Sequence, residues 1–248
     1  MPAAFLETAE GRRLAYHRTE GRGPWVVFLG GLMSDMTGTK AVYLEDWARR
    51  EGRAFLRFDY SGHGESSGAF TDGCIGDWAA DTRAAVATLT EGPIIAVGSS
   101  MGGWQALLLA RHMPERIGGM VTIAAAPDFT EDGYWANFSA AERETLEREG
   151  RVEVPSDYMA PYEITKRMIE DGRAQLVLRA PLPLPFPVRF LQGTADTAVS
   201  VATAVRLLEH AEGPDMQLRL VKDADHRFSD EPCLGLLEKA LSEVLRAC

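Results

Sequence analysis

Short, uninterrupted apolar runs alternate with amphipathic segments along most of this sequence, and this alternation constrains the fold more than any other feature. Runs such as WVVFLG (25–30) and PIIAVG (93–98) have the length and composition of strands that are buried on both faces. The pattern therefore predicts an α/β fold, in which helices cover both faces of a mostly parallel central sheet. The predicted strands are 25–30, 54–59, 93–98, 119–127, 188–193 and 216–221, and the predicted helices are 39–51, 75–90, 101–113, 201–211 and a last one from about 232.

Two regions depart from this alternation. AAFLET and RRLAYHRT, near the start of the sequence, predict an antiparallel hairpin at one edge of the sheet. Residues 128–187 are too long for a plain connection in a compact domain, so we expect a small helical cap inserted after the sixth strand. The expected division is a core of residues 1–127 and 188–248 with a cap of residues 128–187, in which 139–149 and 156–171 are helical and 180–187 is extended.

Composition excludes several classes of function. The chain of 248 residues has a net charge of −10, which repels a phosphate backbone and argues against nucleic-acid binding. No apolar run approaches the roughly 20 residues of a membrane span, and MPAAFLETAEGRR lacks the order of a secretory signal. The three cysteines lie far apart, without metal-binding or disulfide spacing. We therefore expect a soluble, cytoplasmic protein whose oligomeric state the sequence leaves open.

The segment AVGSSMGGW contains the candidate nucleophile. The pattern G-x-S-x-G fits only when Ser100 is central, between Gly98 and Gly102, because centring it on Ser99 would require glycine where valine and methionine stand. A predicted strand precedes the pattern and a predicted helix follows it, which is the setting of a nucleophilic serine on a sharp turn. The alternative is a serine that merely caps the helix, followed by glycines that allow close packing.

A nucleophilic serine needs a base, and the base needs an acid that orients it. His226 lies in a polar loop directly after the last predicted strand, at the sheet edge where Ser100 also emerges, and is the predicted base. Asp196, in the turn after strand 188–193, is the predicted acid. Asp223 and Asp225 are nearer to His226 in sequence, but a neighbouring residue rarely turns back onto the imidazole, so we expect them to shape the loop.

The negatively charged intermediate of such a reaction needs two N–H donors. The amide of Met101, the residue after the nucleophile, is the first predicted donor. The second is the Leu32 amide, because Gly30-Gly31-Leu32 follows a buried strand and lets the backbone approach closely. A simple strand-to-helix turn is the alternative reading of that segment.

Four segments resemble a known family. FLGGLMSDMTGTKA (28–41), RFDYSGHGESSG (57–68), GSSMGGW (98–104) and DADHR (223–227) are similar to the α/β-hydrolases, and more narrowly to the mitochondrial palmitoyl-protein thioesterase and acyl-glucuronide esterase family with its bacterial relatives. The resemblance extends along essentially the whole chain and implies an α/β-hydrolase fold and the triad of Ser100, Asp196 and His226. It also implies oxyanion donors at Leu32 and Met101 and no metal or cofactor. The sequence departs from the family at Gly30, where the family has proline.

Several other residues have both a structural and a functional interpretation. His63, within GHG, is interpreted as a loop residue rather than a metal ligand, and Asp35 and Lys40 as solvated surface charges rather than residues that line the mouth of the site. The aromatic residues of the cap are expected mainly to pack it onto the core. Trp135 and Tyr158 are the candidates for lining an acyl pocket.

The sequence thus predicts a serine hydrolase that cleaves acyl thioesters or carboxylic esters, as an acyl-protein thioesterase (depalmitoylase) or an acyl-glucuronide esterase does. Its partner would be a small-molecule or protein-linked acyl ester or thioester. Hydrolysis of a carbon–carbon bond in diketone-like ring-cleavage products, on the same fold, is the first alternative. A dehalogenase is disfavoured because position 100 is serine rather than aspartate. A non-enzymatic binding protein is disfavoured because all three triad positions are filled.

Overall fold

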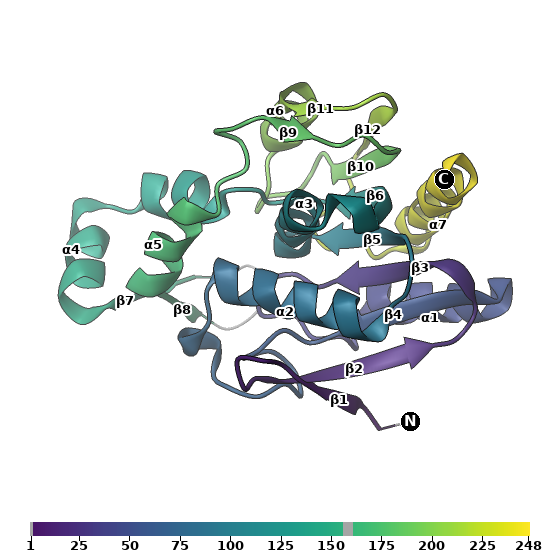
Figure 1. Cartoon of the computed structure of the whole chain (residues 1–248). Helices are drawn as coiled ribbons and strands as arrows, with labels where there is room; N and C mark the ends of the chain where they lie inside the picture. The colour runs from purple at the N-terminus through teal and green to yellow at the C-terminus, as the bar shows by residue number, and fades with distance from the viewer. Residues whose placement is uncertain (1, 156–160) are drawn as a thin grey trace.

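A single sheet of eight strands forms the centre of the molecule (Figure 1). The computed structural model describes residues 2–155 and 161–248. The first two strands are antiparallel and the remaining neighbours run parallel, apart from the antiparallel pair β2–β4. In spatial order the strands are β1 (Ala4–Glu7), β2 (Arg13–Thr19), β4 (Arg53–Phe58), β3 (Arg22–Leu29), β5 (Ile94–Ser99), β6 (Ile117–Ile123), β10 (Val188–Gly193) and β12 (Met216–Val221).

Helices cover both faces of this sheet, as the alternation of the sequence predicts. Along β3, Val27 and Leu29 belong to the apolar core under α2 (Ile75–Leu89) and α3 (Met101–His112), whereas Val26 and Phe28 belong to the core under α1 (Thr39–Glu51) and α7 (Glu231–Ala247). Since both faces of the strand are buried, its sequence is apolar throughout rather than alternating. The core helices are α1 (Thr39–Glu51), α2 (Ile75–Leu89), α3 (Met101–His112), α6 (Val201–His210) and α7 (Glu231–Ala247).

The strand order places the site. The chain passes from β3 outward to β4 and then returns to β5, which lies on the other side of β3. The loops that follow β3 and β5 therefore diverge at a common edge, and this divergence creates the crevice in which open α/β sheets bind their ligands. Leu29 pairs with Gly98 at the ends of these two strands, so the Gly30-Gly31 turn and the Gly98–Gly102 segment are neighbours.

Residues between β6 and β10 form several small elements, of which α4, α5, β7 and β8 lie at one end of the molecule and β9 lies beside α6 (Figure 1). They comprise a short π-helix (Thr130–Trp135), α4 (Ala140–Glu149), β7 (Arg151–Val154), β8 (Tyr162–Thr165), α5 (Lys166–Ala174) and β9 (Leu182–Pro183), the last paired with β11 (Ala211–Glu212). The helix predicted over 139–149 is confirmed, with Ser139 and Glu142 forming a reciprocal capping box. Within the described residues, no helix is long and apolar enough to cross a membrane.

The helix predicted over 156–171 is wrong over 162–165, and its residues 156–160 lie outside the described residues. Residues Tyr162–Thr165 form a strand that pairs antiparallel with β7, and the helix begins only at Lys166. Val152 and Ile164 are partners in this ribbon and both are buried. Cross-strand packing of β-branched side chains therefore outweighs the helical periodicity of the segment.

Asp128 joins the two ends of this insertion, which the sequence reading missed. Its fully buried carboxylate accepts hydrogen bonds from the amides of Val177 (2.8 Å) and Leu178 (3.0 Å) and from the guanidinium of Arg179 (2.6 Å). Asp128 has a positive φ of 59°. In the sequence, the only hint of this role is that an aspartate directly follows a predicted strand. Local patterns do not reveal the contact, because the partners lie about 50 residues away in the chain.

Candidate active site

Ser100 lies on a strained turn between β5 and α3. Its φ of 56° and ψ of −119° are rare for a residue with a side chain, and strain of this kind is concentrated at functional sites. Hydrogen bonds hold the turn: the Ser100 amide donates to the Ile123 carbonyl (2.9 Å), and the Ser100 carbonyl accepts from the amide of Gly103 (2.9 Å). A Cβ at position 98 would lie 2.2 Å from the Gly102 carbonyl oxygen, which explains the glycine there.

The three residues of the predicted triad lie together in hydrogen-bonding geometry. The Nε2 atom of His226 is 3.1 Å from the Ser100 Oγ, and its Nδ1 atom is 2.8 Å from the Asp196 Oδ2. These residues come from the ends of β5, β10 and β12, so the parallel sheet brings them to one edge. With Nδ1–H donating to the carboxylate, Nε2 is left as the acceptor that a base for the serine hydroxyl requires.

Asp196 is held in the ionised form. Burial alone would raise its pKa, but hydrogen bonds from His226 and the Val199 amide (2.8 Å) outweigh burial, and the pKa lies below its usual value. The Ala198 amide (2.9 Å) and the Gln192 Nε2 (3.0 Å) also donate to this carboxylate. Gln192 is a supporting residue that the sequence analysis does not predict. In the sequence, the only hint of its role is a glutamine near the end of an apolar run, and its side chain is fully buried in the structure.

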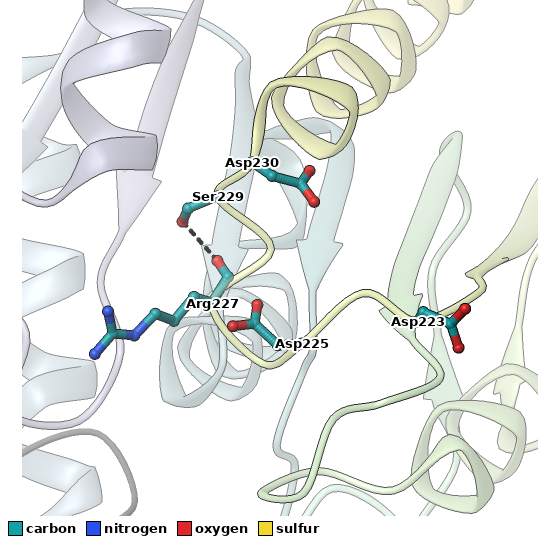
Figure 2. Close-up of a pocket in the computed structure, with 5 residues that line it drawn as sticks. All are labelled: Asp223, Asp225, Arg227, Ser229 and Asp230. Carbon is teal, nitrogen blue, oxygen red and sulfur yellow. Dashed lines mark hydrogen bonds between the residues drawn. The ribbon is translucent and has the colours of Figure 1, made fainter.

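The two competing aspartates have other partners. The Asp225 carboxylate accepts a hydrogen bond from the Phe228 amide (3.0 Å) within its own loop. Asp223 has a φ of 60° and its amide donates to the Thr194 Oγ (2.9 Å). Both side chains line an open polar cavity of about 390 Å³ (Figure 2). They therefore shape the loop that carries His226, as expected, while Asp196 takes the position against the imidazole.

The amides of Leu32 and Met101 are the two predicted oxyanion donors. Within the described part of the chain, neither donates a hydrogen bond to another residue. Met101 is the first residue of α3, where the helix has no acceptor for the amide and its dipole favours negative charge. A Cβ on Gly31 would lie 3.4 Å from the Ser100 Cβ, so the turn that carries Leu32 passes directly beside the nucleophile.

Of the two candidate acyl-pocket residues, only Trp135 lies within the described residues. Two guanidinium groups lie over the indole of Trp135, that of Arg143 at 5.0 Å and that of Arg173 at 4.7 Å from the ring centroid. These contacts give Trp135 a packing partner on each of two helices of the cap, and its part in substrate binding stays a prediction. Tyr158 lies outside the described residues.

His63 is a buried structural residue. Its ring makes edge contacts with Tyr60, Phe70 and Trp78, and its Nδ1 lies 3.2 Å from the Ser61 carbonyl. Burial among these rings lowers the pKa of His63, so the side chain is neutral. Among the residues described, no group of three or more His, Cys, Asp or Glu side chains is placed to hold a metal ion.

The two charges beside the Gly30-Gly31 turn differ from each other. Asp35 is exposed and accepts hydrogen bonds from the amide (2.7 Å) and hydroxyl (2.5 Å) of Thr37, so it is the surface charge that the sequence suggests. Lys40 is half-buried rather than fully solvated. Its ammonium donates a hydrogen bond to the Arg227 carbonyl, in the loop of His226. A partner 187 positions away in the chain is invisible to local sequence reading.

Comparison with known proteins places this chain in a family. The alpha/beta hydrolase fold family matches residues 24–156. Among curated proteins, the mitochondrial palmitoyl-protein thioesterase ABHD10 of Mus musculus is 33% identical over 244 residues, covering 98% of this chain and 82% of the relative.

Two solved structures are similar over nearly their whole length. A putative hydrolase from Agrobacterium vitis S4 is 38% identical with a TM-score of 0.93, covering 98% of this chain and 97% of the other. Alpha/beta hydrolase domain-containing protein 10 from mouse is 31% identical with a TM-score of 0.92, covering 99% of both chains. The chain therefore belongs to the alpha/beta hydrolase fold family and, within it, resembles the ABHD10 palmitoyl-protein thioesterases.

Proposed function

We propose that this protein is a serine hydrolase that cleaves acyl thioesters or carboxylic esters through an acyl-enzyme. The observation that carries the proposal is the continuous hydrogen-bonded series from Ser100 Oγ through His226 to the ionised Asp196. The similarity to palmitoyl-protein thioesterases supports acyl thioesters as the substrate class.

The geometry supports a two-step reaction. His226 Nε2 accepts the proton of Ser100 as Oγ bonds to the acyl carbon, and the carbonyl oxygen becomes an oxyanion that the Leu32 and Met101 amides stabilise. The bond from the acyl carbon to the leaving sulfur or oxygen then breaks, and His226 returns the proton to the leaving group. In the second step a water gives a proton to His226 as its oxygen bonds to the acyl carbon. The bond from the acyl carbon to the Ser100 Oγ then breaks, and His226 returns the proton to Oγ, which releases the acid and restores Ser100.

Replacement of the two adjacent serines tests this proposal. Ser100→Ala is expected to abolish hydrolysis of p-nitrophenyl butyrate and palmitoyl-CoA and to prevent labelling by a fluorophosphonate probe. Ser99→Ala is the matched control and is expected to keep most of both activities, because its backbone occupies the last position of β5. Equal activity of wild type and Ser100→Ala would refute the nucleophile. Turnover of a diketone substrate with no turnover of esters or thioesters would refute the substrate class.

A further inference from the structure

The loop that carries His226 is hydrogen-bonded to the segment that follows the Gly30-Gly31 turn. The Lys40 ammonium, in the first turn of α1, donates a hydrogen bond to the Arg227 carbonyl, one residue beyond His226. The Ser229 hydroxyl donates to the same carbonyl at 2.8 Å (Figure 2). This peptide group is therefore held from within its own loop and from a separate part of the core.

The loop needs such an attachment because its backbone is irregular. Phe228, two residues after His226, has a positive φ of 49°, an unfavourable conformation for a bulky side chain. On the other side of His226, the Ala224 carbonyl accepts a hydrogen bond from the Ala195 amide (3.0 Å), which ties the loop to the turn of Asp196. Lys40 attaches the His226 loop to the part of the core beside Ser100. It lines a cavity of about 60 Å³ together with Gly31 and Ser99, the residue before Ser100.

The surroundings of the ammonium fit this role. Asp225 and Arg227, from the His226 loop, and Cys233, from α7, are the titratable groups that influence Lys40. Burial raises the pKa of Cys233 to about 12, so that thiol is uncharged near neutral pH. Loss of hydration lowers the pKa of Lys40 to about 8, with Asp225 opposing this effect and Arg227 adding to it. The ammonium is thus the charged form below this pH and donates a charge-assisted hydrogen bond, which is stronger than a neutral one.

We propose that Lys40 is a positioning residue that holds the His226 loop in register with Ser100 and the Leu32 amide. The inference rests on the proposed function, because it assigns a supporting role to a residue that does not touch the reacting atoms. Lys40 acts through the Arg227 peptide group, and the effect of losing it is a misplaced imidazole rather than a lost binding contact.

Lys40→Met tests this inference, because methionine retains much of the apolar stem and removes the ammonium. Misplacement of a catalytic group by about 1 Å costs about 100-fold in rate, so kcat/KM is expected to fall by about 10- to 100-fold. The fluorophosphonate labelling rate of Ser100 is expected to fall by a similar factor. Lys222→Met, at the exposed start of the same loop, is the matched control and is expected to leave both rates unchanged.

The pH dependence separates a role of the ammonium from mere packing of the stem. The ratio of wild-type to Lys40→Met kcat/KM is expected to be large below pH 8 and to narrow as Lys40 loses its proton above that pH. Equal rates for the two proteins, or a ratio that stays constant between pH 6 and pH 10, would overturn the inference. If Ser100→Ala remained active, the proposed function itself would fail. An inactive Ser100→Ala beside a fully active Lys40→Met would refute the role of Lys40 alone.

Discussion

Gly102 is the residue at which one added methyl group tests the geometry of the site most directly. A Cβ built there would lie 2.0 Å from the Leu29 carbonyl oxygen and 2.6 Å from that of Gly30. Carbon and carbonyl oxygen approach normally to about 3.3 Å, so Gly102→Ala requires a displacement of about 1.3 Å. The atoms in the way belong to backbone and cannot rotate aside, so the start of α3 and the turn after β3 must move apart.

This displacement acts on the chemistry because each side carries one candidate oxyanion donor, Met101 on α3 and Leu32 on the turn. Removing one such donor costs about 10²- to 10³-fold in a well-studied serine protease, and a misplacement of about 1 Å costs about 10²-fold. We therefore expect Gly102→Ala to lower kcat/KM by about 100-fold or more, which corresponds to about 2.7 kcal/mol of transition-state stabilisation. Overpacking is also expected to lower the free energy of unfolding by about 1–3 kcal/mol.

The measurement combines p-nitrophenyl butyrate hydrolysis with urea unfolding, both carried out on wild type, Gly102→Ala and Gly235→Ala. Gly235 lies in α7, and among the described residues no atom beyond its chain neighbours and its own helix backbone comes within 4 Å of its built Cβ. Alanine there is therefore expected to keep full activity and to stabilise the protein by about 0.5–1 kcal/mol. If Gly102→Ala folded and retained more than half of the wild-type kcat/KM, the two donor segments would not be in the tight contact described here, and the argument from displacement would be refuted.

Two further predictions concern the acid and the acyl group. Asp196→Asn is expected to fold but to lose up to about 10⁴-fold in kcat, because an amide NH₂ facing Nδ1 favours the tautomer that cannot accept the serine proton. Asp225→Asn is expected to lose far less. The reverse ranking in p-nitrophenyl ester assays would show that the acid is misassigned. On p-nitrophenyl esters from acetate to palmitate, kcat/KM is expected to rise by up to about 4-fold for each CH₂ that is buried, and Trp135→Ala is expected to flatten this rise. An unchanged slope with a lower Tm would mean that the indole only packs the cap through its two guanidinium contacts.

The order and type of the core elements could be predicted from the sequence because each depends on local pattern. Strands that are buried on both faces can be recognised in the sequence as short apolar runs. The pattern G-x-S-x-G in a strand–turn–helix setting selects Ser100 over Ser99 without any knowledge of the fold. The capping box of Ser139 likewise lies within four consecutive residues. The cap was harder to predict because β8 is defined by its pairing with β7, not by its own periodicity.

The contacts that assemble the site were decided by the tertiary structure. His226 meets Ser100 across 126 positions of chain, and the choice of Asp196 over the nearer Asp225 depends on which strand end lies beside the imidazole. Gln192 and Lys40 carry no motif, and their hydrogen bonds to the Asp196 carboxylate and the Arg227 carbonyl are visible only in the folded chain. Sequence pattern therefore determined which residues are candidates for the chemistry and at which edge of the sheet they emerge. Only the packed sheet, by fixing the order of its strands, decided which of those residues are held against one another.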